Sequence, residues 1–140
     1  MIKNTCVVIA LGLAMMGCGG SSTPKAGGSS PGSPTLACSP SGTALEIAAK
    51  DLVFDKTCLA APANQAFTIA FTNKDGGTLH NLEILTADPA TDSKAKALFT
   101  GTQFAGVKTT DYSVTALAAG TYFFHCQVHP NQMHGTFVVA

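Results

Sequence analysis

The chain has 140 residues, of which 46% are hydrophobic and 11% are charged, and its formal net charge at pH 7 is zero. This length and composition predict one small globular domain. All eight basic residues are lysines and they are balanced by eight acidic residues, so the chain lacks the basic stripes of proteins that bind nucleic acid.

The first residues have the order of an export signal. Lys3 precedes an apolar run that ends at Met16, and the small residues Gly17 and Cys18 follow it. We predict a signal peptide over residues 1–17, because the run is too short to span a bilayer as a mature helix. The ending M-M-G-C resembles a bacterial lipoprotein box, in which Cys18 becomes the first mature residue and carries the lipid. Ordinary signal cleavage is the alternative.

Residues 18–34 are predicted to form a tether. Thirteen of the 16 residues from Gly19 to Pro34 are Gly, Ser or Pro, and such a composition does not bury a core. As a flexible coil this stretch spans roughly 20–24 Å. We therefore expect a disordered spacer between a lipidated Cys18 and the folded domain.

Residues 35–140 are long enough for a single sandwich core. Apolar side chains recur at every second position along much of this segment, which is typical of half-buried strands. The alternating residues are Leu45 and Ile47; Phe67, Ile69 and Phe71; His80, Leu82 and Ile84; and Tyr122, Phe124 and Cys126.

Turn signals separate these strands at residues 73–77, 119–120 and 130–131. One segment, residues 90–100, has a pattern compatible with a helical turn. Short strands in about 100 residues favour an all-β Greek-key sandwich over βαβ units, which need several amphipathic helices. We predict such a sandwich with a short helical or irregular insertion near residues 90–100.

Three cysteines remain for the folded domain once Cys6 leaves with the signal and Cys18 is lipidated. In an oxidising exported compartment Cys38 and Cys58 can pair, which leaves Cys126 as a free thiol. In the chain-entropy model this disulfide stabilises the fold by about 3 kcal/mol. Two free thiols or intermolecular pairing are the alternatives, because spacing alone does not fix connectivity.

Cys126, His129 and Met133 lie within eight residues of one another between two apolar, strand-like runs. A thiolate, an imidazole and a thioether are soft ligands that suit copper, and one Cys plus two His with a long axial Met is the blue-copper arrangement. His80, in an alternating segment upstream, is the candidate for the missing imidazole. Met133 is the only methionine left after export, and its alternative role is to fill a gap in the core.

Two further imidazoles, His125 and His134, lie next to these candidates in the sequence. Strand alternation turns the side chain of His125 away from that of Cys126. We expect both His125 and His134 to be solvated rather than ligating.

The loop C-Q-V-H-P-N-Q-M and the upstream pair His80-Asn81 resemble the cupredoxins, the type 1 blue-copper proteins that include plastocyanin-like, amicyanin-like and lipid-anchored auracyanin-like members. The resemblance covers about residues 43–140 and includes Gly135, just after the loop. The spacings between the Cys, the His and the Met of the loop fall within the range of that family.

This resemblance implies a Greek-key sandwich that binds one type 1 copper ion. The implied ligands are His80, Cys126 and His129 in the equatorial plane and Met133 on the axis. Asn81 is implied to bridge to the ligand loop and brace the thiolate, with an ordinary strand Asn as the alternative. The outer edge of His129 is implied to be exposed through an apolar patch that serves as the electron port, and Val128 and Pro130 are candidates for that patch.

The implied function is electron transfer between redox protein partners of the membrane or periplasm, with copper cycling between Cu(I) and Cu(II). Such a carrier is not an enzyme and has no small-molecule substrate, because no open coordination position is expected. A copper-delivery or copper-storage lipoprotein that supplies an oxidase is the alternative. A multicopper oxidase or nitrite reductase needs further His clusters, which the four His of the chain do not provide. We expect an exported protein of the bacterial cell envelope, anchored through Cys18, with its domain in the periplasm or on the outer face.

Overall fold

The computed structural model of the protein describes residues 38–140. The predicted signal peptide (1–17) and tether (18–34), and with them Cys18, lie outside the described residues. Within the described part of the chain no helix is present that could cross a membrane.

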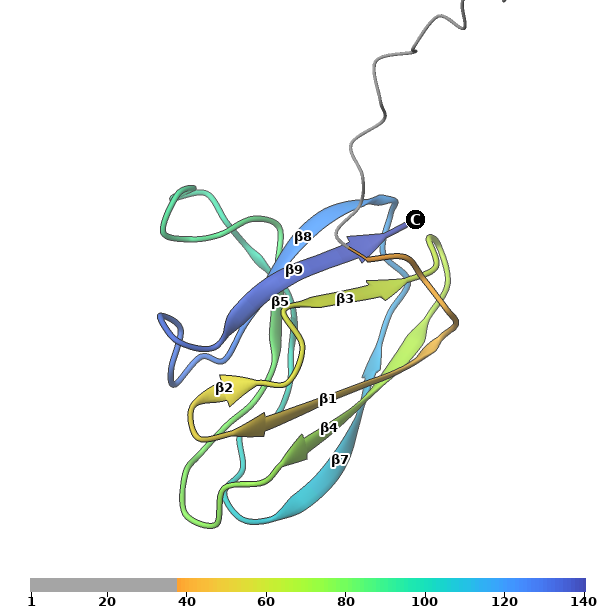
Figure 1. Ribbon diagram of the computed structural model, residues 1–140. Helices are drawn as coiled ribbons and strands as arrows, with labels where there is room; N and C mark the ends of the chain where they lie inside the picture. Colours follow the sequence, from red (N-terminus) through yellow and green to blue (C-terminus); the bar gives the residue numbers. More distant parts are fainter. Residues whose placement is uncertain (1–37) are drawn as a thin grey trace, which may run out of the picture. The chain divides into compact units, whose positions relative to one another are not determined.

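The regular secondary structure of the described residues consists of strands, which form two mixed sheets that face each other (Figure 1). One sheet has the order β2-β1-β4-β7 and the other has the order β3-β9-β8-β5-β6. The strands are β1 (Ala44–Lys50), β2 (Val53–Phe54), β3 (Cys58–Ala61), β4 (Phe67–Asn73), β5 (Glu83–Leu85), β6 (Ala97–Thr100), β7 (Lys108–Val114), β8 (Gly120–His125) and β9 (His134–Val139). β1 runs parallel to β4 and β3 parallel to β9, while the other paired strands are antiparallel. The predicted all-β sandwich is confirmed.

The core forms where the alternating apolar residues of the two sheets meet. In β4, Phe67, Ile69 and Phe71 are buried while the residues between them are partly exposed, as period-two patterning predicts. Aromatic rings then join the two sheets: the centroids of Phe67 and Phe137 are 5.4 Å apart and their rings are stacked. Burial of such large apolar side chains is the main source of stability for a domain of this size.

The predicted pairing of Cys38 with Cys58 is confirmed, against the alternatives of two free thiols or intermolecular pairing. Cys38 and Cys58 form a disulfide with their Cα atoms 6.0 Å apart, and it ties the first described residue to β3. Among the described cysteines, Cys126 is free and buried.

The segment 90–100 contains no helix, so the irregular form predicted for it is confirmed. It begins with a single turn, in which the N–H groups of Thr91 and Asp92 donate to the carbonyl of Asp88 at 3.1 and 2.8 Å. Asp88 accepts a hydrogen bond from the N–H of Ala90, and Asp92 accepts one from the N–H of Lys94. Asp side chains that bond to nearby backbone N–H groups favour turns and helix caps, and no helix continues beyond the turns here. The rest of the segment is the strand β6, which pairs with β5.

The strand expected around His80, Leu82 and Ile84 is shorter than predicted. Only Glu83–Leu85 is β5, while His80 makes an isolated bridge to Phe104. Every residue from 81 to 85 is buried, because the segment is covered on both faces. The alternating apolar pattern therefore predicted an extended segment correctly, but it did not predict which side chains are exposed.

Gly135 is required at its position in β9. A Cβ there would lie 2.5 Å from Cζ of Phe124 and closer still to the carbonyl oxygen of Thr57. That oxygen is fixed, because it accepts a hydrogen bond from the N–H of Thr136 at 2.9 Å. Neither neighbour has room to move.

We predict that Gly135→Ala lowers the free energy of unfolding by about 1–3 kcal/mol through overpacking. Gly120→Ala in the neighbouring strand is the matched control, since a Cβ there meets only the Tyr122 ring at 3.5 Å. The control should stay within about 0.5 kcal/mol of wild type. Denaturant unfolding of the metal-free protein measures both, and equal values for the two variants would contradict the packing explanation.

Candidate metal centre

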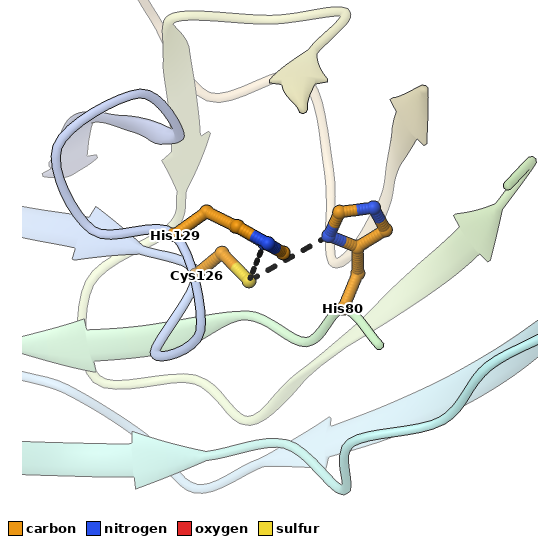
Figure 2. Close-up of side chains that lie close together, drawn as sticks. All are labelled: His80, Cys126 and His129. Atoms are coloured by element: carbon orange, nitrogen blue, oxygen red, sulfur yellow. Dashed lines mark hydrogen bonds between the residues drawn. The ribbon is translucent and has the colours of Figure 1, made fainter. Parts of the chain in front are cut away.

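Three potential metal ligands converge from two parts of the chain. Cys126 follows β8 directly and His129 lies in the loop between β8 and β9, whereas His80 lies between β4 and β5. Figure 2 shows the thiol and the two imidazole rings turned toward one another. The Sγ atom of Cys126 is 3.8 Å from Nδ1 of His80 and 3.9 Å from Nδ1 of His129.

These separations fit a single metal ion. Nitrogen and sulfur ligands bind a first-row ion such as zinc at about 2.0–2.3 Å, so two such donors at trigonal angles lie about 3.8 Å apart. The sulfur-to-nitrogen distances here are 3.8 and 3.9 Å, and all three donor atoms lie within 4.8 Å of one another. A thiol with two imidazoles suits copper far better than it suits hard cations, which prefer oxygen ligands.

Met133 closes the same loop. The N–H of Cys126 donates to the carbonyl of Met133 at 2.9 Å, and the N–H of Met133 donates to the carbonyl of His129 at 2.9 Å. The side chain of Met133 is fully buried in the core cluster that also contains Cys126. The side chain of Met133 therefore packs in the core, and its backbone is bonded to that of Cys126; its role as axial ligand stays a prediction.

His80 is held on two sides. Its backbone exchanges hydrogen bonds with that of Phe104, both at 3.2 Å. Its ring is fully buried, and Nε2 lies 2.8 Å from Oδ2 of Asp75. Hydrogen bonds from the N–H of Asp51 and from His80 hold the pKa of Asp75 below its usual value, so the carboxylate accepts and Nε2 donates. Nδ1, the other ring nitrogen, faces Cys126.

Asp75 is a site residue that the sequence did not single out. It lies within the predicted turn at residues 73–77, where an Asp is already explained as a turn residue. Its contact with His80 appears only in the fold. No local signal in the sequence distinguishes Asp75 from other turn residues.

Asn81 joins the two parts of the site. Its Oδ1 accepts a hydrogen bond from the N–H of Gln127 at 3.0 Å, and its Nδ2 donates to Oε1 of Gln127 at 2.8 Å. Nδ2 also donates to the carbonyl of Gly101 at 2.9 Å. Asn81 is fully buried, and Gln127 directly follows Cys126. The bridge from Asn81 to the ligand loop is therefore present.

His125 is buried, so the prediction that it is solvated is wrong. It is only 8% exposed, and its Nε2 lies 2.8 Å from Oε2 of Glu83, its cross-strand partner on β5. Oε1 of Glu83 accepts hydrogen bonds from Thr100 at 2.8 Å and from Gln127 at 3.0 Å. Strand alternation predicts the face on which a side chain lies, but not the partners that cover it. The available signal in the sequence was Glu83, a charged residue between the apolar residues Leu82 and Ile84, which needs a buried polar partner.

The exposure of His134 and of the residues around His129 agrees with the predictions made for them. His134 is exposed, with its ring stacked on that of Phe123. His129 is partly exposed, and its neighbours Val128 and Pro130 are both exposed. Of the three residues in Figure 2, only His129 reaches the surface.

Comparisons with known proteins agree with this geometry. A family model described as a cupredoxin-like domain matches residues 13–139. Auracyanin-A of Chloroflexus aurantiacus is 32% identical over 156 aligned positions, which cover 95% of this chain and 93% of that protein.

Two solved structures are similar in fold. That of auracyanin A from Chloroflexus aurantiacus, described as a "blue" copper protein, is 27% identical with a TM-score of 0.62 over 71% of this chain and 99% of that one. Reduced auracyanin from Roseiflexus castenholzii is 25% identical with a TM-score of 0.61 over 70% and 97%. Since the family model spans nearly the whole chain and the donors around Cys126 fit one copper ion, the chain belongs to the cupredoxin family and has one copper site.

Proposed function

We propose that the protein transfers single electrons between redox protein partners through one type 1 copper site, with His80, Cys126 and His129 as equatorial ligands and Met133 as the axial ligand. The observation that carries the proposal is the Cys126 thiol between two imidazole nitrogens, at 3.8 and 3.9 Å. The similar structure of auracyanin A, a "blue" copper protein, supports it.

The protein's own contribution is a rigid and dry set of ligands. Copper bound there supplies the one-electron chemistry, between Cu(I) and Cu(II). Cys126, His80 and Met133 are fully buried, so the fold excludes water from that side of the site. Backbone hydrogen bonds fix Cys126 and Met133 to each other. Ligands that are held in place need little rearrangement when the charge of the site changes, and this favours fast electron transfer over catalysis.

The exposed edge of His129 is the proposed route for electrons. Its ring contacts the buried site through Nδ1 and reaches the surface beside Val128, which is 40% exposed. Partner proteins then dock near His129 and Val128. This arrangement needs no small-molecule substrate and no nucleic acid.

The proposed location is the bacterial cell envelope, with the domain outside the cytoplasm and a lipid on Cys18 as the anchor. The signal and lipoprotein box of the sequence are its main support. The disulfide between Cys38 and Cys58 adds to it, because such bonds persist in oxidising compartments.

Adding Cu(II) to the purified protein should give one copper per chain, an intense thiolate-to-copper band in the visible spectrum and a narrow parallel hyperfine splitting in EPR. A reversible redox couple should accompany the colour. A colourless complex with ordinary Cu(II) EPR would falsify the proposal. Ready loss of copper to chelators without a reversible couple would instead favour copper delivery or storage.

Substitution of the sulfur ligands should separate their roles. Cys126→Ser should abolish the blue band because the charge-transfer donor is removed. Met133→Leu should keep the band and raise the reduction potential, since an axial ligand tunes the potential without supplying the colour. Visible spectra and voltammetry measure both outcomes. A Cys126→Ser variant that remains blue would show that this thiolate is not the ligand.

We also propose that Asn81 braces the ligand loop before copper binds. Asn81→Ala leaves the Gln127 N–H and the Gly101 carbonyl without their partner, so we expect the free energy of unfolding of the metal-free protein to fall by about 2–4 kcal/mol. Asn131→Ala, in the exposed turn of the same loop, is the control and should change it by less than about 0.5 kcal/mol. Equal free energies of unfolding for Asn81→Ala and Asn131→Ala in chemical denaturation would argue against this role of Asn81.

A further inference from the structure

The carboxylate of Asp75 is the only charged group that contacts a proposed copper ligand among the residues the structure describes. It lies 2.8 Å from Nε2 of His80, and its side chain is 15% exposed. His129 differs in this respect, since its ring is partly exposed and none of the described side chains bonds to its Nε2. The two imidazoles therefore have different environments.

Two hydrogen bonds besides that to His80 fix the position of Asp75. Its Oδ1 accepts a hydrogen bond from the N–H of Asp51 at 3.1 Å, and its own N–H donates to Oδ1 of Asn73 at 2.8 Å. Asn73 is fully buried and donates to the carbonyls of Thr78 and Phe104 at 2.8 and 2.9 Å. The carboxylate is thus held by the backbone N–H of Asp51, and the backbone of Asp75 by the buried side chain of Asn73, so neither bond depends on His80.

The turn that supplies the Asp51 N–H has an unusual backbone. Lys50 and Val53 pair across a two-residue hairpin turn, in which Asp51 has a φ of 52° and Leu52 a φ of 61°. Such turns strongly prefer Asn-Gly or Asp-Gly, because a side chain such as that of Leu is disfavoured at positive φ. Strained backbone is often found where it serves a site. Here the turn directs a backbone N–H at the carboxylate under His80 (Figure 1 shows the β1–β2 hairpin at the left).

We propose that Asp75 is a positioning residue that fixes His80 as the Nε2–H tautomer and places a carboxylate one hydrogen bond from the copper site. The proposal rests on the function proposed above and adds how this chain sets its reduction potential. A carboxylate bound to the far nitrogen of a ligating imidazole orients the ring and makes it a better donor. The added negative charge favours Cu(II) over Cu(I), because the oxidised ion carries the larger positive charge.

The tautomer matters before any metal binds. Without an acceptor at Nε2, the proton of neutral His80 is free to sit on Nδ1, the nitrogen that faces Cys126 at 3.8 Å. A proton there blocks the lone pair that a metal needs. Asp75 removes that competing state and leaves the Cys126 side of the ring ready to bind.

The test compares Asp75→Asn and Asp75→Ala with Asp51→Asn as the matched control. Asp75→Asn keeps the shape and a hydrogen-bond acceptor but removes the charge. Asp51→Asn also removes one negative charge, but it keeps the backbone N–H that donates to Asp75. The side chain of Asp51 itself pairs only with the exposed Lys50 among the described ion pairs. Thermal unfolding of the metal-free variants checks that each one folds.

We expect Asp75→Asn to lower the ratio of Cu(II) to Cu(I) affinity about tenfold, which raises the one-electron reduction potential by about 59 mV. Asp75→Ala should lower the Cu(II) affinity by about 10- to 100-fold. Asp51→Asn should leave the potential at the wild-type value. Equal potentials for Asp75→Asn and Asp51→Asn overturn the charge effect.

Nitrogen-15 NMR of the metal-free protein tests the tautomer without copper. His80 should carry its proton on Nε2 in wild type and lose this preference in Asp75→Ala. Wild type with the proton on Nδ1 overturns the proposal, even if the protein binds copper and turns blue. A wild type that does not turn blue refutes the electron-transfer function instead, and the NMR result still decides the role of Asp75.

Discussion

The hydrogen bonds between Asn81 and Gln127 join the two parts of the chain on which the copper site depends. His80 and Cys126 are 46 residues apart, and they come from different segments of the sandwich. Gln127 follows Cys126 and Asn81 follows His80, so the amide pair sets the two proposed ligands side by side. Because Asn81 is fully buried, breaking the pair leaves its polar atoms without these partners. This cost favours one relative position of the two segments.

The same region contains an unusual number of buried polar side chains. Asn73, Asn81, Glu83 and His125 are all buried, next to a core of large apolar residues. Glu83 connects His125 to Gln127 and Thr100, and Asn73 connects the β4–β5 segment to Phe104. Only Nδ1 of His125 lacks a partner among the buried side-chain atoms described. A network satisfied to this extent makes its surroundings rigid and specifies one arrangement.

The two imidazoles at the site differ in burial and are suited to different roles. His80 is fully buried, and each of its ring nitrogens has a neighbour in the fold. Nε2 faces Asp75 and Nδ1 faces Cys126. His129 is held through its backbone in the loop, and its ring is partly exposed. One imidazole is thus suited to keep the site in shape, and the other to connect it with the surface.

The sequence by itself determined the class of fold and the candidate donors, because these depend on local pattern and chemical type. Period-two runs such as Phe67 to Phe71 produced strands, and the loop from Cys126 to Met133 carries three of its soft donors within eight residues. Only the tertiary structure decided what surrounds those donors. Asp75 looks like any turn Asp until the fold brings it to His80, and His125 looked solvated until Glu83 lay opposite it. Alternation and turn propensity describe neighbours along the chain, whereas these contacts join residues whose approach is set by sheet pairing and core packing.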